Sequence, residues 1–122
     1  MRYEVDGDLQ GLCDCHCIDC RRSSGAPYVT WGSVRPAQLR IVKGGVRRVP
    51  HAERLRFFAD CCGTHLFFKD SDEAEWIDIT IASLDEPGAY APAKSVWTED
   101  KLPWVVLDPR LPSFPRKGTT GI

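Results

Sequence analysis

Features that identify several common protein classes are missing from this sequence of 122 residues. No apolar run is long enough to span a membrane, so we expect no membrane span. Lysine and arginine together number 16, against 17 aspartates and glutamates. A sequence-independent nucleic-acid binder normally carries a basic surplus, so we expect no nucleic-acid partner. Only three histidines are present, and no serine–histidine–aspartate arrangement suggests itself around them.

We also expect no export signal, because the opening segment MRYEVDGD is polar and acidic. We therefore expect a cytoplasmic protein whose six cysteines are reduced. Four of these cysteines lie between positions 13 and 20 and are too close together to cross-link distant parts of a fold. Cys61 and Cys62 are adjacent, and a bridge between neighbours would be strained. Metal binding is therefore the better interpretation of the cysteines.

The length fits a single domain over residues 1–122, and the pattern of its residues is mainly β. Segment 75–81 alternates isoleucine with polar residues, which is typical of a half-buried strand. Helical periodicity is weak throughout, so we expect small antiparallel β-sheets. Three prolines and a Gly-Thr-Thr-Gly segment predict a loose C-terminal tail over 109–122. β-branched and aromatic residues predict further strands at 28–34, 39–42, 55–58, 66–68, 95–97 and 104–107.

The densest chemical signal is a run of three thiols, Cys15, Cys17 and Cys20, in C-x-C-x-x-C spacing. Zinc binds cysteine thiolates in tetrahedral geometry at about 2.3 Å. In an extended segment, residues two apart point to the same side, so Cys15 and Cys17 can face one ion. The C-x-x-C spacing is the tight turn common in zinc knuckles. Three protein ligands would leave the fourth position of the ion open, which indicates a site of chemistry.

Charge limits what such a centre could do. Three thiolates and a divalent zinc leave a single net negative charge, which makes a poor Lewis acid towards water. The centre is better suited to holding a substrate thiol as its thiolate at neutral pH. Arg21 and Arg22 directly follow the ligands. We expect these arginines to offset the added negative charge of the substrate thiolate, or to bind substrate carboxylates.

Two further residues leave the ligand set open. Cys13 lies two residues before Cys15, so four thiols could instead close a structural all-cysteine site. His16 lies between two ligands and would point away from their common face. We therefore expect His16 to face solvent or to support the site from outside the ligand set.

Five segments carry a likeness to one known family, and they run in order along nearly the whole chain. They are RYEVDG at 2–7, CHCxxCRRxxG at 15–25, FxxxCGTxLF at 58–67, SLDEP at 83–87 and VWTxDKxPW at 96–104. Together these segments resemble the glutathione-dependent formaldehyde-activating enzymes, a family that also includes centromere protein V. The cysteine motif with its double arginine is specific, so a chance resemblance would be unusual.

The resemblance implies a mainly β, zinc-knuckle fold with two zinc sites. It implies that Cys15, Cys17 and Cys20 hold a catalytic zinc, with the sulfur of glutathione completing the coordination. The implied activity is that of a carbon–sulfur lyase similar to S-hydroxymethylglutathione synthase, which adds glutathione or another small thiol to a small aldehyde such as formaldehyde. The family's second zinc is structural and is held by an early C-x-C pair and a later C-x-x-C-G pair.

This chain departs from the family pattern at the structural zinc. The early pair would fall before Met1, and Ala59 stands where the first cysteine of the later pair is expected. Cys62 is then a remnant of that site, and we expect one zinc per chain and a genuinely short N-terminus. Ser95 also occupies the place of a family histidine. We expect buried phenylalanines around the second motif to replace the stabilisation that the ion supplies elsewhere.

These departures keep other functions open. A non-catalytic zinc-binding or interaction domain of the same fold would surround its ion with four protein sulfurs. The enzyme would instead show three sulfurs plus water or an added thiol. Thiol redox chemistry at Cys17 and Cys20 is a third interpretation, which Cys15 disfavours because a third thiol favours metal retention. His65 closely follows the second motif, and we expect it in a structural or surface role.

Overall fold

The computed structural model describes residues 1–117, and within them the chain is mainly β, as predicted. It forms nine strands, one α-helix and four short 3₁₀ turns. The helix, α1, spans Ile18–Ser24. Nothing in these residues forms a helix with the length and apolar character needed to cross a membrane. The strands are β1 (Arg2–Val5), β2 (Gln10–Cys15), β3 (Val29–Val34), β4 (Leu39–Lys43), β5 (Val46–His51), β6 (Arg54–Ala59), β7 (His65–Lys69), β8 (Ile77–Thr80) and β9 (Lys94–Val96). The 3₁₀ turns lie at Pro36–Gln38, Ile81–Ser83, Pro87–Ala89 and Thr98–Asp100.

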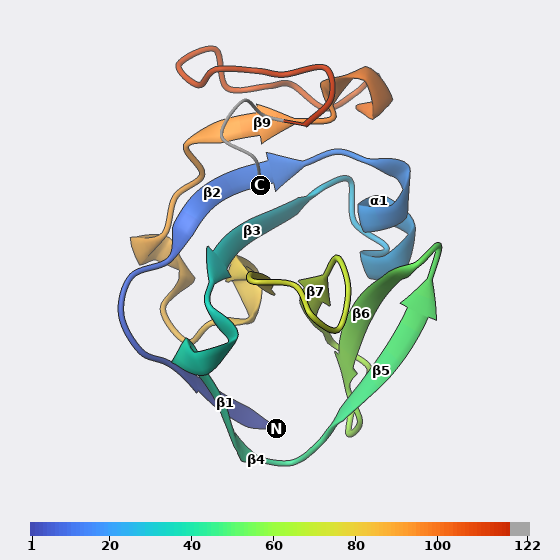
Figure 1. The fold of residues 1–122 in the computed structure, drawn as a ribbon. Coiled ribbons are helices and arrows are strands. Elements are labelled where there is room, and N and C mark those ends of the chain that lie inside the picture. The colour runs from blue at the N-terminus through green and yellow to red at the C-terminus, as the bar shows by residue number, and fades with distance from the viewer. Residues whose placement is uncertain (118–122) are drawn as a thin grey trace.

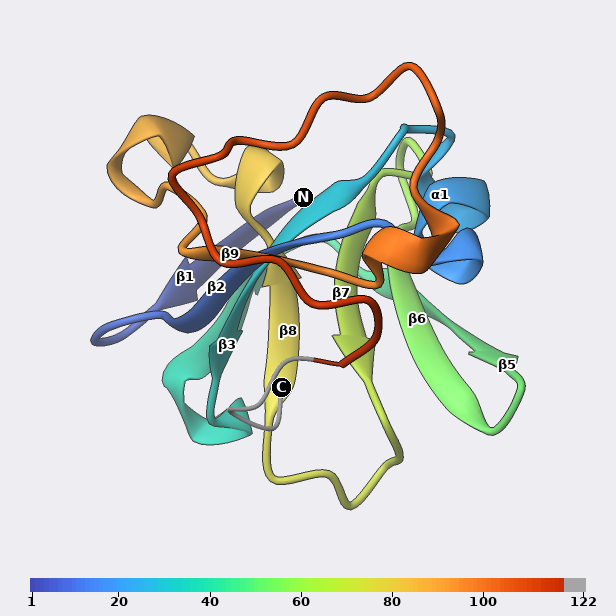
Figure 2. The ribbon, with the colours of Figure 1, turned by 90° about the horizontal axis from the view of Figure 1, so that it is seen from above.

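Seven of the strands form one sheet in the order β5-β6-β7-β8-β3-β2-β9. Its neighbouring strands are antiparallel except for β2 and β9, which run parallel. The other two strands, β1 and β4, pair antiparallel as a separate small sheet. Figure 1 shows this small sheet at the opposite end of the molecule from β9. Figure 2 shows β3, β8, β7, β6 and β5 following one another across the large sheet.

Alternation of side chains gives the large sheet two different faces. One face carries an apolar cluster around Phe67 and Ile79, and side chains of β1 and β4 pack against it. The opposite face carries a second cluster around Trp31 that includes three cysteines. Neighbouring positions fall on opposite faces, since Phe67 belongs to the first cluster and Phe68 packs against the second. The thiols of Cys13, Cys15, Cys17 and Cys20 therefore lie on one side of the sheet.

The short helix α1 follows β2 at a point where the sequence pattern predicted no helix. Its start is capped by Cys17, whose sulfur accepts a hydrogen bond from the backbone N–H of Cys20 at 3.3 Å. Its end is closed by Gly25, whose φ of 66° lies in the left-handed region. Seven residues make about two helical turns, which is too short for an apolar period to show in the sequence.

The predicted strand at 104–107 is wrong, because this segment forms a turn and an irregular stretch. Trp104 and Val106 are exposed. The ammonium group of Lys101 donates to the carbonyls of Leu102 and Val105 at 3.1 and 2.8 Å. These contacts satisfy the backbone carbonyls without a partner strand, so the apolar composition of the segment did not lead to a ladder.

The predicted tail, 109–122, lies partly within the described residues, and its described part is hydrogen-bonded to β9. Residues 109–117 run along β9, as the orange-red segment in Figure 2 shows. The N–H of Ser95 donates to the carbonyl of Pro112 at 3.0 Å, and the N–H of Phe114 donates back to Ser95 at 2.9 Å. These bonds hold the segment against the edge strand, in place of a further β-strand. Residues 118–122 lie outside the described residues.

Candidate metal centre

Three thiol sulfurs from β2 and α1 converge on one point. Cys15 ends β2, Cys17 caps α1, and Cys20 lies within that helix. All three sulfurs lie within 4.8 Å of one another, and those of Cys15 and Cys20 are 3.6 Å apart. Two sulfurs bound to a tetrahedral zinc at 2.3 Å are about 3.8 Å apart, so the group fits such an ion. Across residues 1–117, no other cluster of three cysteine, histidine or acidic ligand atoms is this close.

The backbone around β2 explains how the three sulfurs meet. The N–H of His16 donates to the carbonyl of Val96 at 3.1 Å, which keeps the chain extended up to the end of β2. The helix then begins at once, with the N–H of Arg21 donating to the carbonyl of Cys17 at 3.1 Å. The ring of His16 lies outside the thiol group, 4.8 Å from the ring of Tyr28. It is buried, so His16 supports the site from outside and does not face solvent.

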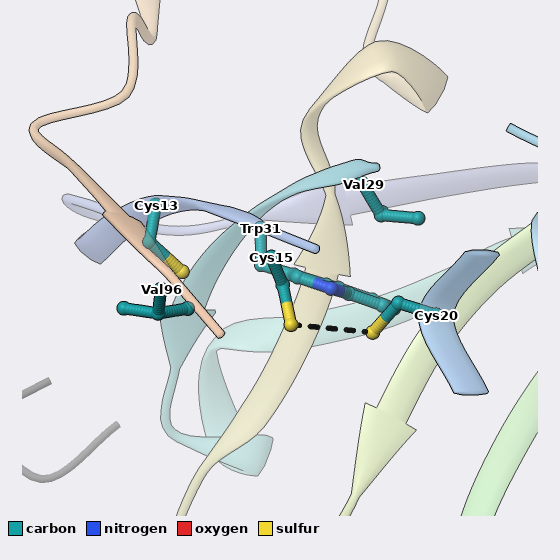
Figure 3. Packing of buried hydrophobic residues seen from close by; sticks show 6 residues of the cluster. All are labelled: Cys13, Cys15, Cys20, Val29, Trp31 and Val96. Carbon is teal, nitrogen blue, oxygen red and sulfur yellow. Dashed lines mark hydrogen bonds between the residues drawn. The ribbon is translucent and has the colours of Figure 1, made fainter. Parts of the chain in front are cut away.

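Cys13 lies in the same apolar cluster but outside the thiol group. Figure 3 shows the sulfurs of Cys15 and Cys20 facing each other, whereas the sulfur of Cys13 lies beside Val96. Burial raises the pKa of Cys13 to about 12. The geometry therefore favours three protein sulfurs over four.

A buried arginine from β6, Arg56, lies against the thiol group. Arg56 is 7% exposed, and its two terminal nitrogens donate to the sulfur of Cys20 at 3.8 and 3.9 Å. One of them also donates to the hydroxyl of Ser23 at 3.3 Å, and the guanidinium carbon lies 4.9 Å from the centre of the Phe68 ring. No ion pair between the described residues includes Arg56.

A buried arginine without an anionic partner is rare in folded proteins. The ionisable group that Arg56 contacts is the thiol of Cys20, and thiolate is also the form that binds metals. Arg56 was not predicted from the sequence, although the sequence contains a signal for it. It is a charged residue inside the predicted strand at 55–58, with apolar residues on both sides.

Hydrogen bonds within the thiol group decide where negative charge settles. Hydrogen bonds from Cys15 and then Cys20 lower the pKa of Cys17. The contact with Cys17 raises the pKa of Cys15, and the contact with Cys20 and burial add to that effect. Cys17 is therefore the first of the three thiols to ionise, and it is also the most exposed of them.

A cavity of about 180 Å³ opens beside the three sulfurs. Its aromatic wall is formed by Trp31, Phe68, Trp76 and Trp97, and its charged lining by Arg54, Arg56, Lys69, Asp70, Asp78 and Lys117. Burial raises the pKa of Asp78 to about 6, so the lining can carry a proton close to neutral pH. Arg21 and Arg22, the residues predicted to bind substrate, are not part of this lining. Both lie on α1, where Arg21 is half-buried and Arg22 is exposed.

His65 lies next to the cluster in a structural position, as expected. Its ring stacks on Phe58 with centres 4.7 Å apart and meets Trp31 edge-on at 5.2 Å. Its Nδ1 lies 3.4 Å from the hydroxyl of Ser23, which links it to Arg56. Burial lowers the pKa of His65 to about 4, and the charge of Arg56 adds to that effect. His65 is therefore neutral at neutral pH.

The second cysteine motif forms the turn between β6 and β7. Ala59, in the place of the family's first cysteine, is buried together with Leu66 and Phe67 in the apolar cluster of the other sheet face. Cys61 and Cys62 are exposed. Packing therefore occupies the position where the family pattern has a zinc ligand.

Comparison with known proteins assigns the family. The family model described as glutathione-dependent formaldehyde-activating enzyme matches residues 1–100. The crystal structure of a Rhodobacter sphaeroides protein, a structural genomics target, is similar with a TM-score of 0.53. At 18% sequence identity, over 92% of this chain and 89% of that one, this similarity shows the fold alone. No curated protein is significantly similar. Because the family model covers most of its length, the chain belongs to the glutathione-dependent formaldehyde-activating enzyme family.

Proposed function

We propose that the protein is a zinc-dependent carbon–sulfur lyase that joins glutathione, or another small thiol, to a small aldehyde such as formaldehyde. Cys15, Cys17 and Cys20 would hold the zinc ion. The observation that carries this proposal is the buried Arg56, which donates to Cys20 beside three converging thiols, because a cation in that place favours anionic sulfur. The family supplies the substrate classes, glutathione and formaldehyde.

The chain itself contributes charge and shape to this chemistry. Zinc held by three thiolates keeps the sulfur of an external thiol ionised at neutral pH. Arg56 offsets part of the resulting negative charge through its two N–H donors to Cys20. The cavity beside the sulfurs holds thiol and aldehyde together. This proximity supplies much of the rate gain, since aldehydes react readily with thiolates.

The lining of the cavity suits a peptide thiol that carries carboxylates. Its aromatic wall keeps bulk water away from the sulfur atoms. Arg54, Lys69 and Lys117 provide cations within the lining, and such groups bind carboxylates by charge-assisted hydrogen bonds. Arg21 and Arg22 follow Cys20 on α1 and lie outside this lining. We therefore assign them only to substrate carboxylates that lie outside the cavity.

Calorimetric titration of the zinc-loaded protein tests this proposal. Glutathione should bind with measurable heat, whereas S-methylglutathione, which has the same carboxylates but no thiol, should bind at least tenfold more weakly. The Cys17→Ser variant should lose the difference between the two ligands. Equal binding of both ligands by the unmodified protein would contradict thiolate binding and would favour the non-catalytic zinc domain.

A measurement of rate completes the test. Exchange spectroscopy by NMR follows the interconversion of formaldehyde, glutathione and S-hydroxymethylglutathione without a coupled assay. The zinc-loaded protein should accelerate this exchange above the uncatalysed reaction, and the Cys17→Ser variant should not. Binding of glutathione without acceleration would overturn the enzymatic part of the proposal.

A further inference from the structure

Outside the thiol group, Cys61 and Cys62 form an exposed pair of adjacent thiols in the turn between β6 and β7. Their sulfurs are 3.6 Å apart. The turn is closed by two backbone bonds, from the N–H of Ala59 to Thr64 at 2.9 Å and from the N–H of Gly63 to Ala59 at 2.8 Å. The φ of Gly63 is 75°, a value that glycine adopts readily. The two thiols are therefore held side by side by an ordered turn.

The surroundings favour reactivity at Cys62. The hydroxyl of Thr64 lies 3.1 Å from the Cys62 sulfur, and the contacts with Thr64 lower the pKa of Cys62. A cavity of about 250 Å³ adjoins both cysteines. Its lining combines the apolar side chains of Leu66 and Leu84 with polar groups, among them the hydroxyls of Tyr3 and Ser83, 2.6 Å apart. A ligand on the sulfurs therefore has room for an organic substituent.

Geometry excludes several uses of this pair. Adjacent Cα atoms are about 3.8 Å apart, below the range of about 4.4–6.8 Å in which disulfides form without strain. With sulfur bonds of about 2.3 Å, a linear ion needs about 4.6 Å between its two sulfurs, whereas a bent centre needs about 3.8 Å. The observed 3.6 Å suits a bent centre. A tetrahedral ion would need further ligands, and within residues 1–117 no third cysteine, histidine or acidic ligand atom joins this pair.

We propose that Cys61 and Cys62 form a chelating site for trivalent organoarsenicals, separate from the thiol group of Cys15, Cys17 and Cys20. Such an arsenical carries one organic group, which leaves two positions for sulfur in a bent arrangement. In the reaction, R–As(OH)₂ and two cysteine thiols give R–As(S–Cys)₂ and two waters. Two As–O and two S–H bonds break, and two As–S and two O–H bonds form. Arsenic stays trivalent, so the step needs neither an oxidant nor a reductant.

Phenylarsine oxide added to the zinc-loaded protein tests the site. Intact-mass spectrometry should show one phenylarsine group per chain, while elemental analysis shows that the zinc is retained. Cys61→Ser and Cys62→Ser should each weaken binding by about 10²–10⁴-fold, because each removes the second, intramolecular bond. Both side chains are exposed, so these substitutions leave the packing intact. Dimercaptopropanol should release the arsenical, whereas a monothiol at the same thiol concentration should not.

Three results would overturn the proposal. They are undiminished binding in both serine variants, stoichiometric loss of zinc on binding, and equal release by the monothiol and the dithiol. The first would show that other atoms bind the arsenical, and the second would place it on Cys15, Cys17 and Cys20. The third would show a single sulfur bond. None of these results bears on glutathione binding, so the site and the proposed lyase activity fail or stand separately.

Discussion

At the scale of single residues, Arg56 is a buried cation in direct contact with the thiol group of Cys15, Cys17 and Cys20. It is buried, it donates twice to the sulfur of Cys20, and it has no carboxylate partner in the part of the chain that the structure describes. Removing one partner of a charge-assisted hydrogen bond costs more free energy at a buried site than at an exposed one. Arg56 therefore stabilises the ionised, metal-binding form of the cysteines.

Replacing Arg56 by methionine should weaken zinc binding, because the thiolates lose their hydrogen-bonding cation. Hydrogen bonds to charged groups contribute about 1.5–3 kcal/mol, and the long distances to sulfur favour the lower end, which is about tenfold in affinity. Competition with a chromophoric chelator measures the effect. Arg54→Met is the matched control, since Arg54 is exposed and pairs with Asp70 at 3.7 Å. Equal zinc affinity in the two variants would refute the role of Arg56.

His65 should make stability depend on pH. Burial lowers its pKa to about 4, whereas an unfolded histidine titrates near 6.5. Between these values the unfolded chain binds a proton that the folded chain does not, so this contribution to stability is lost as the pH falls from about 6.5 to about 4. The loss should be about 2–3 kcal/mol over this window.

Urea denaturation at pH 7 and pH 4.5 measures this contribution as a difference between the wild-type protein and His65→Phe. The wild-type protein should lose more stability on acidification than the variant. Zinc release affects both proteins and cancels in the comparison. An identical pH dependence of the two proteins would contradict this, because it would show that His65 has the same pKa in the folded and unfolded states.

At the scale of elements, α1 joins its glycine C-cap to the thiol group, because the same short helix carries Cys20. The helix carries Cys20 and ends at Gly25 with φ 66°. A Cβ added at Gly25 would meet no atom within 4 Å. The cost of alanine there is therefore only the free energy needed to hold a residue with a Cβ in the left-handed backbone conformation.

Gly25→Ala should therefore lower the free energy of unfolding by about 1 kcal/mol. Gly88→Ala is the matched control, because Gly88 also has open space around it but no positive φ. Chemical denaturation of both variants at one pH gives the comparison. A loss at Gly88 as large as that at Gly25 would contradict the conformational explanation.

The elements also show what could be predicted from the sequence. The strand β8 falls within the predicted segment 75–81, where the alternation of isoleucine with polar residues indicated a strand. The strand β3 falls within the predicted segment 28–34, where β-branched and aromatic residues indicated one. The helix α1 escaped prediction because it is short and depends on its two caps. Segment 104–107 was predicted as a strand from composition alone, and its carbonyls are satisfied by Lys101 instead.

At the scale of the whole molecule, the site is assembled from distant parts of the chain. Cys15, Cys17 and Cys20 are close in sequence, so their meeting was predictable from spacing. Arg56 reaches Cys20 from β6, 36 positions along the chain. That contact depends on how β6 and α1 are placed by the sheet, which sequence periodicity does not specify. The same reason explains why the cations of the cavity were not predicted.

The central claim is that three protein sulfurs hold one zinc with a position open to a thiol. X-ray absorption at the zinc edge tests this most directly on the zinc-loaded protein, before and after glutathione is added. We expect three sulfur neighbours and one lighter atom in the first spectrum, and four sulfur neighbours in the second. Four sulfurs before glutathione is added, or a spectrum that glutathione leaves unchanged, would contradict it.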